Sequence, residues 1–438
     1  MTPVPPFGGH SLFLFLVQVA VLLLLALLTG RLAMRFGMPA IVGELLTGIL
    51  LGPSLLGAVA PGWAEWLFPH QAEQFHVLDA FGQIGVLLLV GVTGVSLDLK
   101  LIRKRGSTAA KISIPGLVIP LGLGVGAGFL VPSALLAGSG DQRAVFALFL
   151  GIAMCVSAIP VIAKTLIDLK LLHRNVGQLI LISGTVDDMV GWLGLSLVTA
   201  MATTGLHAGT VARSVGFLVL FVVVSVVVGR PVVRAVMRRV SDGATIGAAV
   251  VVLLTMSAAS HLLGLEAVLG ALVGGMLIRN AGGDVLEKLL PLRTVVMTFL
   301  APVFFAMAGL RMDLTALVQP SVLVAAVVLL LIAVLGKFAG AFLGAWLSGL
   351  NRWEALGIGA GMNARGVVEV VVAMVGLRLG VLSTEMYTIV VLIAIVTSLM
   401  SPPILRAAAA RIEVTASERL RLSEYEPPSR QQPAADPA

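Results

Sequence analysis

The stretch GELLTGILLGP at residues 43–53 is partly repeated 227 residues later, as GALVGGMLI at residues 270–278. The matching residues are Gly43, Leu45, Gly48 and Leu50 in the first copy and Gly270, Leu272, Gly275 and Leu277 in the second. A further match follows each copy, with GVSLDL at 94–99 and GLRMDL at 309–314. Glycines and leucines match easily in apolar sequence, but two pairs of matches in the same order predict an internal repeat.

The composition indicates that both copies lie in a membrane. Apolar residues make up 58% of the chain and charged residues 12%, with a mean hydropathy of +1.06, whereas about a quarter of a typical soluble domain is charged. Many apolar runs reach the roughly 20 residues that a bilayer crossing requires. The first, at 11–30, follows no Lys or Arg and is too long for the apolar region of a signal peptide. We therefore expect it to remain as a membrane span.

We predict thirteen membrane spans, at about 11–30, 39–57, 80–97, 112–132, 143–166, 175–201, 209–229, 244–263, 265–279, 293–310, 321–348, 354–378 and 385–405. With the N-terminus outside, 23 Lys and Arg residues fall in inside segments and 4 in outside loops, while Lys337 and Arg365 lie within spans. This distribution follows the positive-inside rule. The pI of about 10.1 therefore reflects membrane topology, and we expect no nucleic-acid partner.

The repeat has opposite orientations in its two copies. Its matches fall in spans two and three and again in spans nine and ten, so spans 1–6 correspond to spans 8–13, with span 7 as a connector. Seven crossings separate the copies, and an odd number inverts their topology. Inverted repeats are typical of secondary transporters, which bind their substrates near the membrane midplane where the repeats meet. We predict an all-α, polytopic transmembrane domain over 1–408 and a disordered cytoplasmic tail, polar and rich in proline, over 409–438.

Two corresponding spans contain signals for a broken helix. Span five contains VSAIPV (156–161), where Pro160 removes a backbone donor and prevents a straight helix. Span twelve contains GMNARGVVE (361–369), in which Asn363 and Gly366 align with Ser157 and Pro160. We expect two unwound segments that cross near the midplane, although a simple kink at Pro160 is the alternative.

Span twelve also contains a buried charge pair. Arg365 stands in an otherwise apolar span, where it can neutralise the carbonyl ends of the broken helices. Glu369 follows one helical turn later, at the i+4 position. A purely structural ion pair between the two residues is the other interpretation.

The stretch LISGTVDDMVGW (181–192) places Asp187 and Asp188 side by side in an apolar span. A charge at the bilayer centre costs about 2.5–3.5 kcal/mol on insertion scales. Neighbouring helical residues point about 100° apart, so one carboxylate can line a water-filled path while the other faces a neighbouring helix. Such a carboxylate can hold a proton or a small monovalent cation, but not both well, and an antiporter requires this competition. A buried hydrogen-bonding role is the simpler alternative.

Three further residues stand out in the apolar spans. Lys337, in AVLGKFAGAF (333–342), is too deep to reach the membrane surface easily, so we expect a partner at Asp187 or Asp188. A fixed structural pair is the alternative. Glu44, at the start of span two, serves a cytoplasmic entrance or caps its helix, and the sequence does not decide between these roles. The single Cys155 excludes a disulfide framework or zinc cluster within one chain, which favours packing.

Seven motifs in order resemble the monovalent cation:proton antiporter-2 family, which includes bacterial sodium/proton and potassium/proton exchangers and plant cation/proton exchangers. The resemblance covers about 10–405. Its motifs are MPAIVGELLTGILLGPSLLG (38–57), SAIPVIAKTLIDLKLL (157–172), SGTVDDMVGW (183–192), LGALVGGMLI (269–278), APVFFAMAGLRMDL (301–314), LGKFAGAFLG (335–344) and MNARGVVEVVVA (362–373). The resemblance implies the sodium/proton antiporter fold, a core domain with crossed helices, a dimerising scaffold domain and elevator-like exchange.

The same resemblance implies roles for the charged residues. The second aspartate of the family's pair binds the ion, so Asp188 is the expected Na⁺ or K⁺ ligand. The first corresponds to Asp187, whose partner in electrogenic members is a lysine at the position of Lys337. Many plant members have Asn at the position of Asp187, so the Asp here favours electrogenic exchange with more than one proton per cation. Gated potassium-efflux members carry a long nucleotide-binding domain that this sequence lacks, so we expect no cofactor.

We therefore expect a transporter rather than an enzyme, which exchanges Na⁺ or K⁺ for protons as a homodimer in the lipid of a cell membrane. An excess of Arg over Lys, 22 to 7, suits a GC-rich bacterium and hence its inner membrane. A potassium efflux channel would need a carbonyl filter or a charged ring, and a symporter for organic solutes would need a more polar site. A transport-inactive sensor is disfavoured by the intact pair and Lys337. The sequence does not identify the cation.

Overall fold

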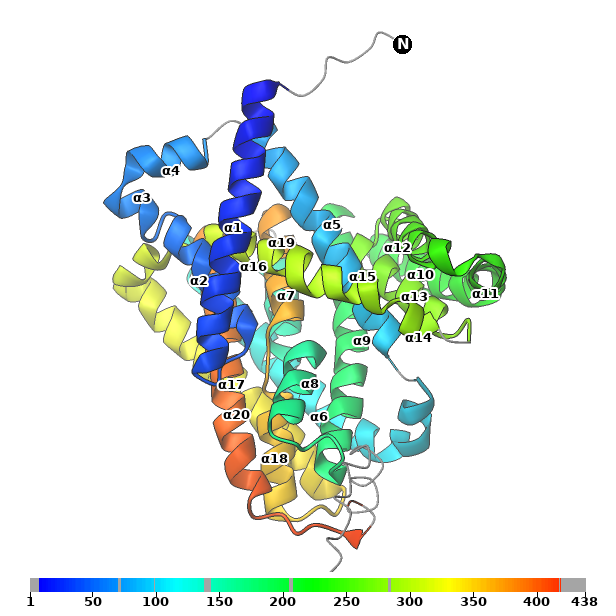
Figure 1. The fold of residues 1–438 in the computed structure, drawn as a ribbon. Coiled ribbons are helices and arrows are strands. Elements are labelled where there is room, and N and C mark those ends of the chain that lie inside the picture. The colour runs from blue at the N-terminus through cyan, green and yellow to red at the C-terminus, as the bar shows by residue number, and fades with distance from the viewer. Residues whose placement is uncertain are drawn as a thin grey trace, which may run out of the picture.

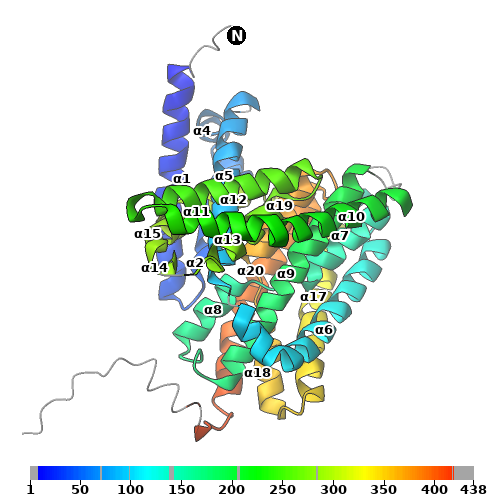
Figure 2. The same cartoon turned by 90° about the vertical axis from the view of Figure 1, so that its right-hand side faces the viewer.

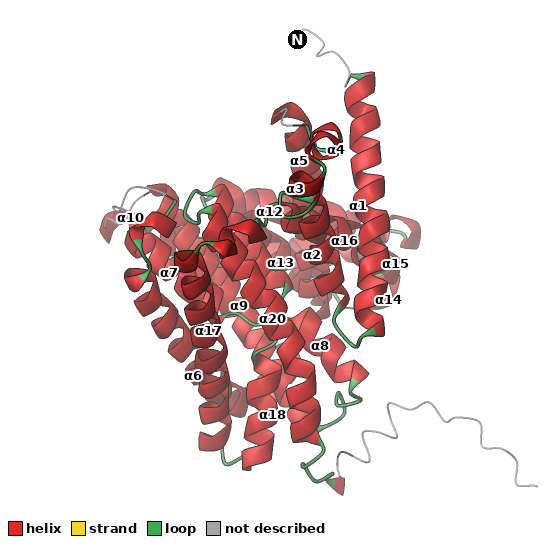
Figure 3. Cartoon of the chain, turned by 90° about the vertical axis from the view of Figure 1, so that its left-hand side faces the viewer, coloured by secondary structure: helices red, strands yellow, loops and turns green. Residues whose placement is uncertain are grey.

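The computed structural model describes residues 8–69, 72–97, 99–137, 143–204, 208–282, 285–416 and 418. The described part of the chain is helical and contains no β-strand (Figures 1 and 3). An isolated bridge between Leu136 and Leu382 is its sole β-type pairing. The predicted all-α class is confirmed.

The helices of the first half are α1 Gly9–Arg35, α2 Ala40–Leu51, α3 Leu56–Val59, α4 Pro61–Leu67, α5 Ala72–Ser96, α6 Leu99–Leu130, α7 Arg143–Cys155, α8 Ile159–Asp168 and α9 Asn175–Thr204. A connector follows, made of α10 Ala208–Val224, a π-helical turn η3 Ser225–Gly229 and α11 Arg230–Arg239. The helices of the second half are α12 Thr245–Leu262, α13 Ala267–Arg279, α14 Val285–Lys288, α15 Leu290–Val295, a π-helical turn η5 Val296–Leu300, α16 Ala301–Leu310, α17 Pro320–Leu347, α18 Arg352–Met362, α19 Val367–Arg378 and α20 Thr384–Ala409. Short 3₁₀ turns are η1 Ser133–Leu135, η4 Asp242–Ala244 and η6 Leu314–Val318.

The long apolar helices follow the predicted spans. Within the described residues, ten helices are long and apolar enough to cross a membrane, and an eleventh crossing is the bent pair α18–α19. Two predicted spans are absent from this count. The span predicted at 143–166 is divided into α7 and α8, and the short span predicted at 265–279 is the 13-residue helix α13.

Close glycine contacts reproduce the predicted repeat. Helix α2 crosses α16 where Gly48 meets Gly309, and α13 crosses α5 where Gly275 meets Gly94. A Cβ at any of these four positions would clash with the backbone of the opposite helix. The matched glycines therefore allow two equivalent close crossings, each between a helix of the first half and a helix of the second. The match at Asp98 lies outside the described residues.

The register of the repeat extends to the preceding helices. A Cβ at Gly43 of α2 would clash with the backbone of α1 at Thr29, and one at Gly270 of α13 would clash with α12 at Met256. Met256 follows Thr29 by 227 residues, the same offset that separates the two glycines. The pairs α1–α2 and α12–α13 therefore pack in the same register.

The helices pack as two groups, each of which combines both halves of the chain. Helices α1, α2, α5, α12, α13 and α16 pack mainly against one another and form the scaffold group. Helices α6–α9 and α17–α20 form the core group, and much of it fills the lower part of Figure 1. The connector runs across the face seen in Figure 2 and contacts α9 of the core group and α13 of the scaffold group.

Segments predicted on the same side of the membrane contact one another. On the predicted outer side, Arg311 pairs with Asp79 at 2.7 Å, and Arg378 pairs with Glu266 at 2.9 Å. The first pair lies within the scaffold group. The second joins the end of α19 in the core group to the residue before α13 in the scaffold group.

The predicted tail begins where α20 ends, at Ala409. Beyond it, Glu418 accepts a 2.6 Å hydrogen bond from the backbone N–H of Asn175, at the start of α9, and pairs with Arg174 at 3.3 Å. Burial raises the pKa of Glu418, but the backbone N–H groups of Asn175 and Thr415, with Arg174, more than offset this and hold it below its usual value. The predicted disorder of the tail beyond Glu418 lies outside the described residues.

Candidate ion-binding site

Two breaks in helices cross inside the core group. Residues 156–158 separate α7 from α8, and 363–366 separate α18 from α19, which are bent by 40°. The N–H of Ala158 donates to the carbonyl of Ala364 at 3.1 Å. The hydroxyl of Ser157 donates to the carbonyl of Met362 at 2.9 Å. These hydrogen bonds hold the two unwound segments together, as the sequence predicts.

Pro160 lies in the first turn of α8 rather than at a kink within one helix. Proline is well suited to that position, because the first N–H groups of a helix have no partner within it. The alternative of a simple kink at Pro160 is therefore wrong. Asn363 ends α18 at the other break, and its buried side-chain oxygen Oδ1 makes no hydrogen bond within the described residues.

Two buried cations face the end of α7. The guanidinium of Arg365 donates to the carbonyls of Ala153 at 2.8 Å and Met154 at 2.5 Å. The ammonium of Lys337, on α17, donates to the carbonyl of Cys155 at 2.5 Å. The C-terminal end of a helix carries a partial negative charge. The broken helix α7 therefore ends inside the core group against two full positive charges.

Arg365 also forms the predicted pair with Glu369, at 3.1 Å and one helical turn apart. Both side chains are buried, and Oε2 of Glu369 makes no hydrogen bond within the described residues. The hydroxyl of Ser398, on α20, donates to the carbonyl of Arg365. Sequence reasoning missed Ser398. Its available signal was TSLMS (397–401), a group of hydroxyls in an otherwise apolar span.

Asp187 faces Lys337. Its Oδ2 lies 2.5 Å from the ammonium nitrogen, and both side chains are fully buried. The hydroxyl of Ser157 lies 3.3 Å from the same carboxylate oxygen. The structure thus resolves the alternative left by the sequence: the partner of Lys337 is the first aspartate.

Asp188 faces a different element. It is 1% exposed and interacts with the backbone N–H of Ile159, the first residue of α8. The N-terminus of a helix favours an anion through its free N–H groups and its dipole. Asp188 makes no ion pair within the part of the chain described, and its Oδ1 has no hydrogen-bond partner there. The two aspartates are therefore equally buried but differently compensated.

Glu44 is not brought to the aspartate pair. Its side chain is half-buried against Gly30 of α1, in the scaffold group, and makes no hydrogen bond or ion pair within the described residues. Pro39, which precedes α2, lines a cavity of about 290 Å³ with Thr165 of α8 and Arg406 of α20. The cavity lies at the boundary of the two groups. A role of Glu44 at an entrance stays a prediction.

The site contains carboxylate and amide oxygens, which are groups that can bind a small cation. One buried side-chain oxygen each of Asp187, Asp188 and Asn363, on α9 and at the crossing, has no hydrogen-bond partner among the described residues. In transporters with inverted repeats, discontinuous helices of this kind hold the coupling ion near the midplane. The fold and this site define the class of secondary transporters.

Residues 20–410 match the model of the transmembrane sodium/hydrogen exchanger family. The chain belongs to this family, which confirms the relationship that the motifs predict. It is 30% identical over 400 residues to the Na(+)/H(+) antiporter NhaS4 of Synechocystis, which covers 90% of this chain and 97% of that protein. It is 28% identical over 400 residues to the Na(+)/H(+)-K(+) antiporter GerN of Bacillus cereus, covering 90% and 96%.

Further similarities extend to a plant protein and to solved structures. The chain is 28% identical over 403 residues to Cation/H(+) antiporter 17 of Arabidopsis thaliana but spans only 48% of that protein. The structure superposes on the sodium proton antiporter MjNhaP1 of Methanocaldococcus jannaschii with a TM-score of 0.66 and 15% identity, covering 92% of this chain and 99% of that one. This likeness confirms the predicted sodium/proton antiporter fold.

Proposed function

We propose that the protein exchanges a monovalent cation, Na⁺ or K⁺, for protons by competition at Asp188. One observation carries the proposal: Asp188 is a buried carboxylate beside two crossed broken helices, and it has no cationic partner in the described part of the chain. Asp187, one residue earlier, is neutralised by Lys337. Asp188 is therefore the carboxylate available to take either species.

Competition at one carboxylate is sufficient for obligatory exchange. An empty, charged Asp188 is costly to move through an apolar region, whereas a carboxylate carrying a proton or a cation is nearly neutral. Only the two loaded forms then cross between the sides of the membrane. Each cation carried in one direction is therefore matched by protons carried in the other.

The pair of Lys337 and Asp187 supports electrogenic exchange. If the cation binds both carboxylates, Asp187 leaves Lys337, and the unpaired, buried ammonium loses its proton. Cation binding then releases one proton from Asp188 and one from Lys337. Two protons would be exchanged for one cation, so each cycle would move one net charge.

The names of two relatives support leaving both cations in the proposal. NhaS4 is named for sodium, and GerN for sodium and potassium. Carboxylate and amide oxygens bind either ion, and selection between them depends on the size and number of ligands.

A proton-flux assay tests the exchange. Purified protein in liposomes with an acidic lumen and a pH-sensitive dye should respond to external NaCl or KCl with proton efflux, whereas choline chloride should give none. Equal responses to all three salts would overturn the proposal. A potassium–valinomycin potential in a sodium-exchange test should drive the wild type but not the double variant Asp187→Asn/Lys337→Gln. A wild type indifferent to the potential would show electroneutral exchange.

We further propose that the protein is a homodimer in a bacterial inner membrane, with the N-terminus outside and the C-terminus in the cytoplasm. The distribution of Lys and Arg supports this orientation. Contacts such as Arg311 with Asp79 support the assignment of those two segments to one common side. Labelling in intact cells with a membrane-impermeant reagent should modify a cysteine introduced at Glu65 and spare one at Arg239. Light scattering in detergent should give twice the mass of one chain.

A further inference from the structure

An apolar cavity lies between the connector and the two helix groups that it contacts. It has a volume of about 360 Å³ and lies between α9, α13 and the connector. Met189 and Leu193 line it from α9, Val226 from the connector, and Leu269 from α13. The cavity thus touches the helix of the aspartate pair at the residue directly after Asp188. We call it the α13 groove.

The length and lining of the α13 groove suit a hydrocarbon chain. Its lining on α13 runs from Leu269 to Asn280, a distance of about 16 Å at the rise of an α-helix. This is about half of the roughly 30 Å hydrocarbon core of a bilayer, or one leaflet. Ser225 lies in the groove, but its hydroxyl already donates to the carbonyl of Phe221 at 2.6 Å. The body of the groove therefore offers no free polar group.

One end of the groove is positively charged. Arg230 and Asn280 line it there, and Arg230 is exposed with no hydrogen bond or ion pair in the described part of the chain. Arg234, one turn further, already donates to the carbonyl of Asn280 at 3.3 Å. The sequence of α11, RPVVRAVMRR, contains four arginines and no acid. An anionic group at the polar end would meet no opposing carboxylate from the lining.

A local distortion forms one wall of the groove. The π-helical turn Ser225–Gly229 interrupts the connector where its exposed valines give way to the arginines of α11. Single π-turns inside α-helices occur frequently at functional sites. The connector thus changes from apolar to positively charged at this turn, as a lipid changes from apolar tails to a polar headgroup.

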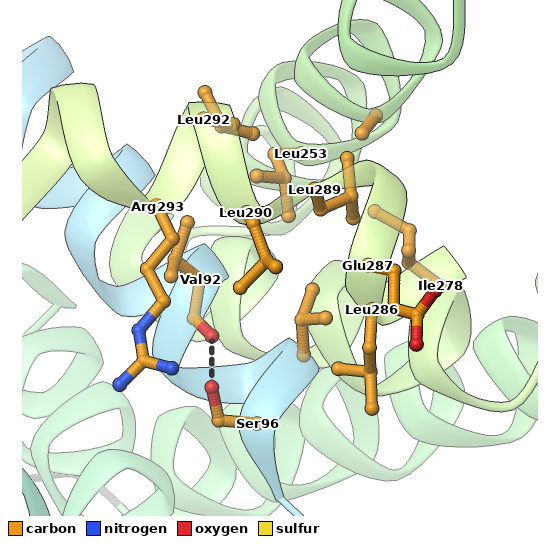
Figure 4. A pocket seen from close by; sticks show the side chains of 12 residues that line it. Val92, Ser96, Leu253, Ile278, Leu286, Glu287, Leu289, Leu290, Leu292 and Arg293 are labelled. Atoms are coloured by element: carbon orange, nitrogen blue, oxygen red, sulfur yellow. Dashed lines mark hydrogen bonds between the residues drawn. The ribbon is translucent and has the colours of Figure 1, made fainter. Parts of the chain in front are cut away.

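A second cavity shows that an apolar pocket alone does not select an anion. It has a volume of about 240 Å³ and lies in the scaffold group, among α5 and α12–α15 (Figure 4). Arg293 lines it, but Glu287 lines the opposite side of the same pocket. The opposed charges cancel any preference for an anionic headgroup. The α13 groove has no such acid.

We propose that the α13 groove binds one anionic phospholipid, with its phosphate at Arg230 and an acyl chain along α13. The acyl chain would pack against Met189 and Leu193 and so fill the space between α9 and the scaffold group. The bound lipid stabilises the arrangement of the two groups in this structure.

Lipid binding can be tested without transport. Delipidated protein in detergent is titrated with phosphatidylglycerol or phosphatidylcholine, and thermal unfolding is followed. Phosphatidylglycerol should stabilise the wild type in a saturable manner and phosphatidylcholine should not. Arg230→Gln should weaken the apparent affinity about five-fold, the factor for the roughly 1 kcal/mol of one arginine near an anionic lipid. Arg238→Gln, an exposed change on the same helix, is the matched control and should leave the affinity unchanged.

A second variant tests the acyl chain. Val226→Trp places a large side chain from the exposed connector into the groove and should abolish stabilisation by phosphatidylglycerol. Three results would overturn the proposal: stabilisation by both lipids alike, equal losses in Arg230→Gln and Arg238→Gln, or unchanged stabilisation of Val226→Trp. A fourth such result would be a Val226→Trp protein with half the mass of the wild type in detergent. The groove would then hold a second copy of the chain.

Discussion

Asp187 and Asp188 are adjacent in the sequence, yet the rotation of α9 gives them separate partners. Asp187 meets the ammonium of Lys337 at 2.5 Å, while Asp188 meets the start of α8. A buried ion pair with one member removed typically loses about 3–5 kcal/mol, because the remaining charge has no partner. Asp188 has no such partner to lose in the described residues. Substitution at Asp187 should therefore reduce stability as well as alter exchange, whereas substitution at Asp188 should affect mainly transport.

Asp188→Asn should abolish cation-dependent proton flux, because an amide neither titrates nor neutralises a cation. Folding should persist, since the change keeps the shape of the side chain and removes a buried charge that has no cationic partner in the described residues. The measurement is flux in liposomes, with thermal unfolding in detergent as the check on folding. Glu287→Gln, at an exposed acid on α14, is the matched control. Wild-type flux in Asp188→Asn would exclude this residue as the exchange site.

Arg365→Gln should destabilise the protein strongly. The change leaves Glu369 and the last carbonyls of α7 without their cation, a loss of about 3–5 kcal/mol for a buried pair. Thermal unfolding in detergent measures the effect, with exposed Arg213→Gln as the control. If both variants unfold at the temperature of the wild type, Arg365 does not hold the broken helix in place.

At the scale of elements, the sequence predicts the parts that depend on local chemistry. Proline in span five and the polar break in span twelve predict the crossing, and the matched glycines predict the repeat. The residues alone left the partner of Lys337 open between the two aspartates, because it depends on the rotation of α9 against α17, whereas the family resemblance implied Asp187. The pair of Glu266 and Arg378 was missed for a similar reason, since only tertiary packing brings the two together.

Gly48→Ala and Gly275→Ala should destabilise the protein to similar extents. Each methyl group would clash with backbone at an equivalent helix crossing, in opposite halves of the chain. Gly126→Ala on α6 is the control, because its methyl group would enter open space. Alanine is favoured over glycine within a helix by about 0.5–1 kcal/mol, so this control should be neutral or stabilising. Thermal unfolding measures the stability of the three variants against the wild type. A Gly48→Ala or Gly275→Ala protein as stable as the wild type would contradict the close crossings.

At the scale of the molecule, few polar contacts join the two helix groups within the part of the chain that the structure describes. The ion pair of Glu266 with Arg378 is one of them, and it lies at the end of the groups predicted to face outside. Exchange by an elevator-like movement requires the core group to slide against the scaffold group. A contact that joins the groups must then break or move in each cycle, whereas a contact within one group need not.

Cross-linking tests this movement. Cysteines at Glu266 and Arg378, in a Cys155→Ala background, should arrest exchange when joined by a short bis-methanethiosulfonate linker, and should recover it when reduction cleaves the linker's disulfide bonds. The matched control places cysteines at Asp79 and Arg311, which lie within the scaffold group, and should remain active when joined. The measurement is proton flux before and after reduction. Full activity of the first joined pair would mean that the groups do not move apart there.

The central claim is that a proton and a cation compete for Asp188, and the apparent KM for the cation as a function of pH tests it most directly. If one proton must leave before the cation binds, the apparent KM rises by up to about tenfold for each unit by which the pH falls on the acid limb. The maximal rate is preserved. The measurement is initial proton flux in liposomes over a range of cation concentrations, from acidic to alkaline pH. An apparent KM that stays constant over that range, in an active protein, would contradict competition at this carboxylate.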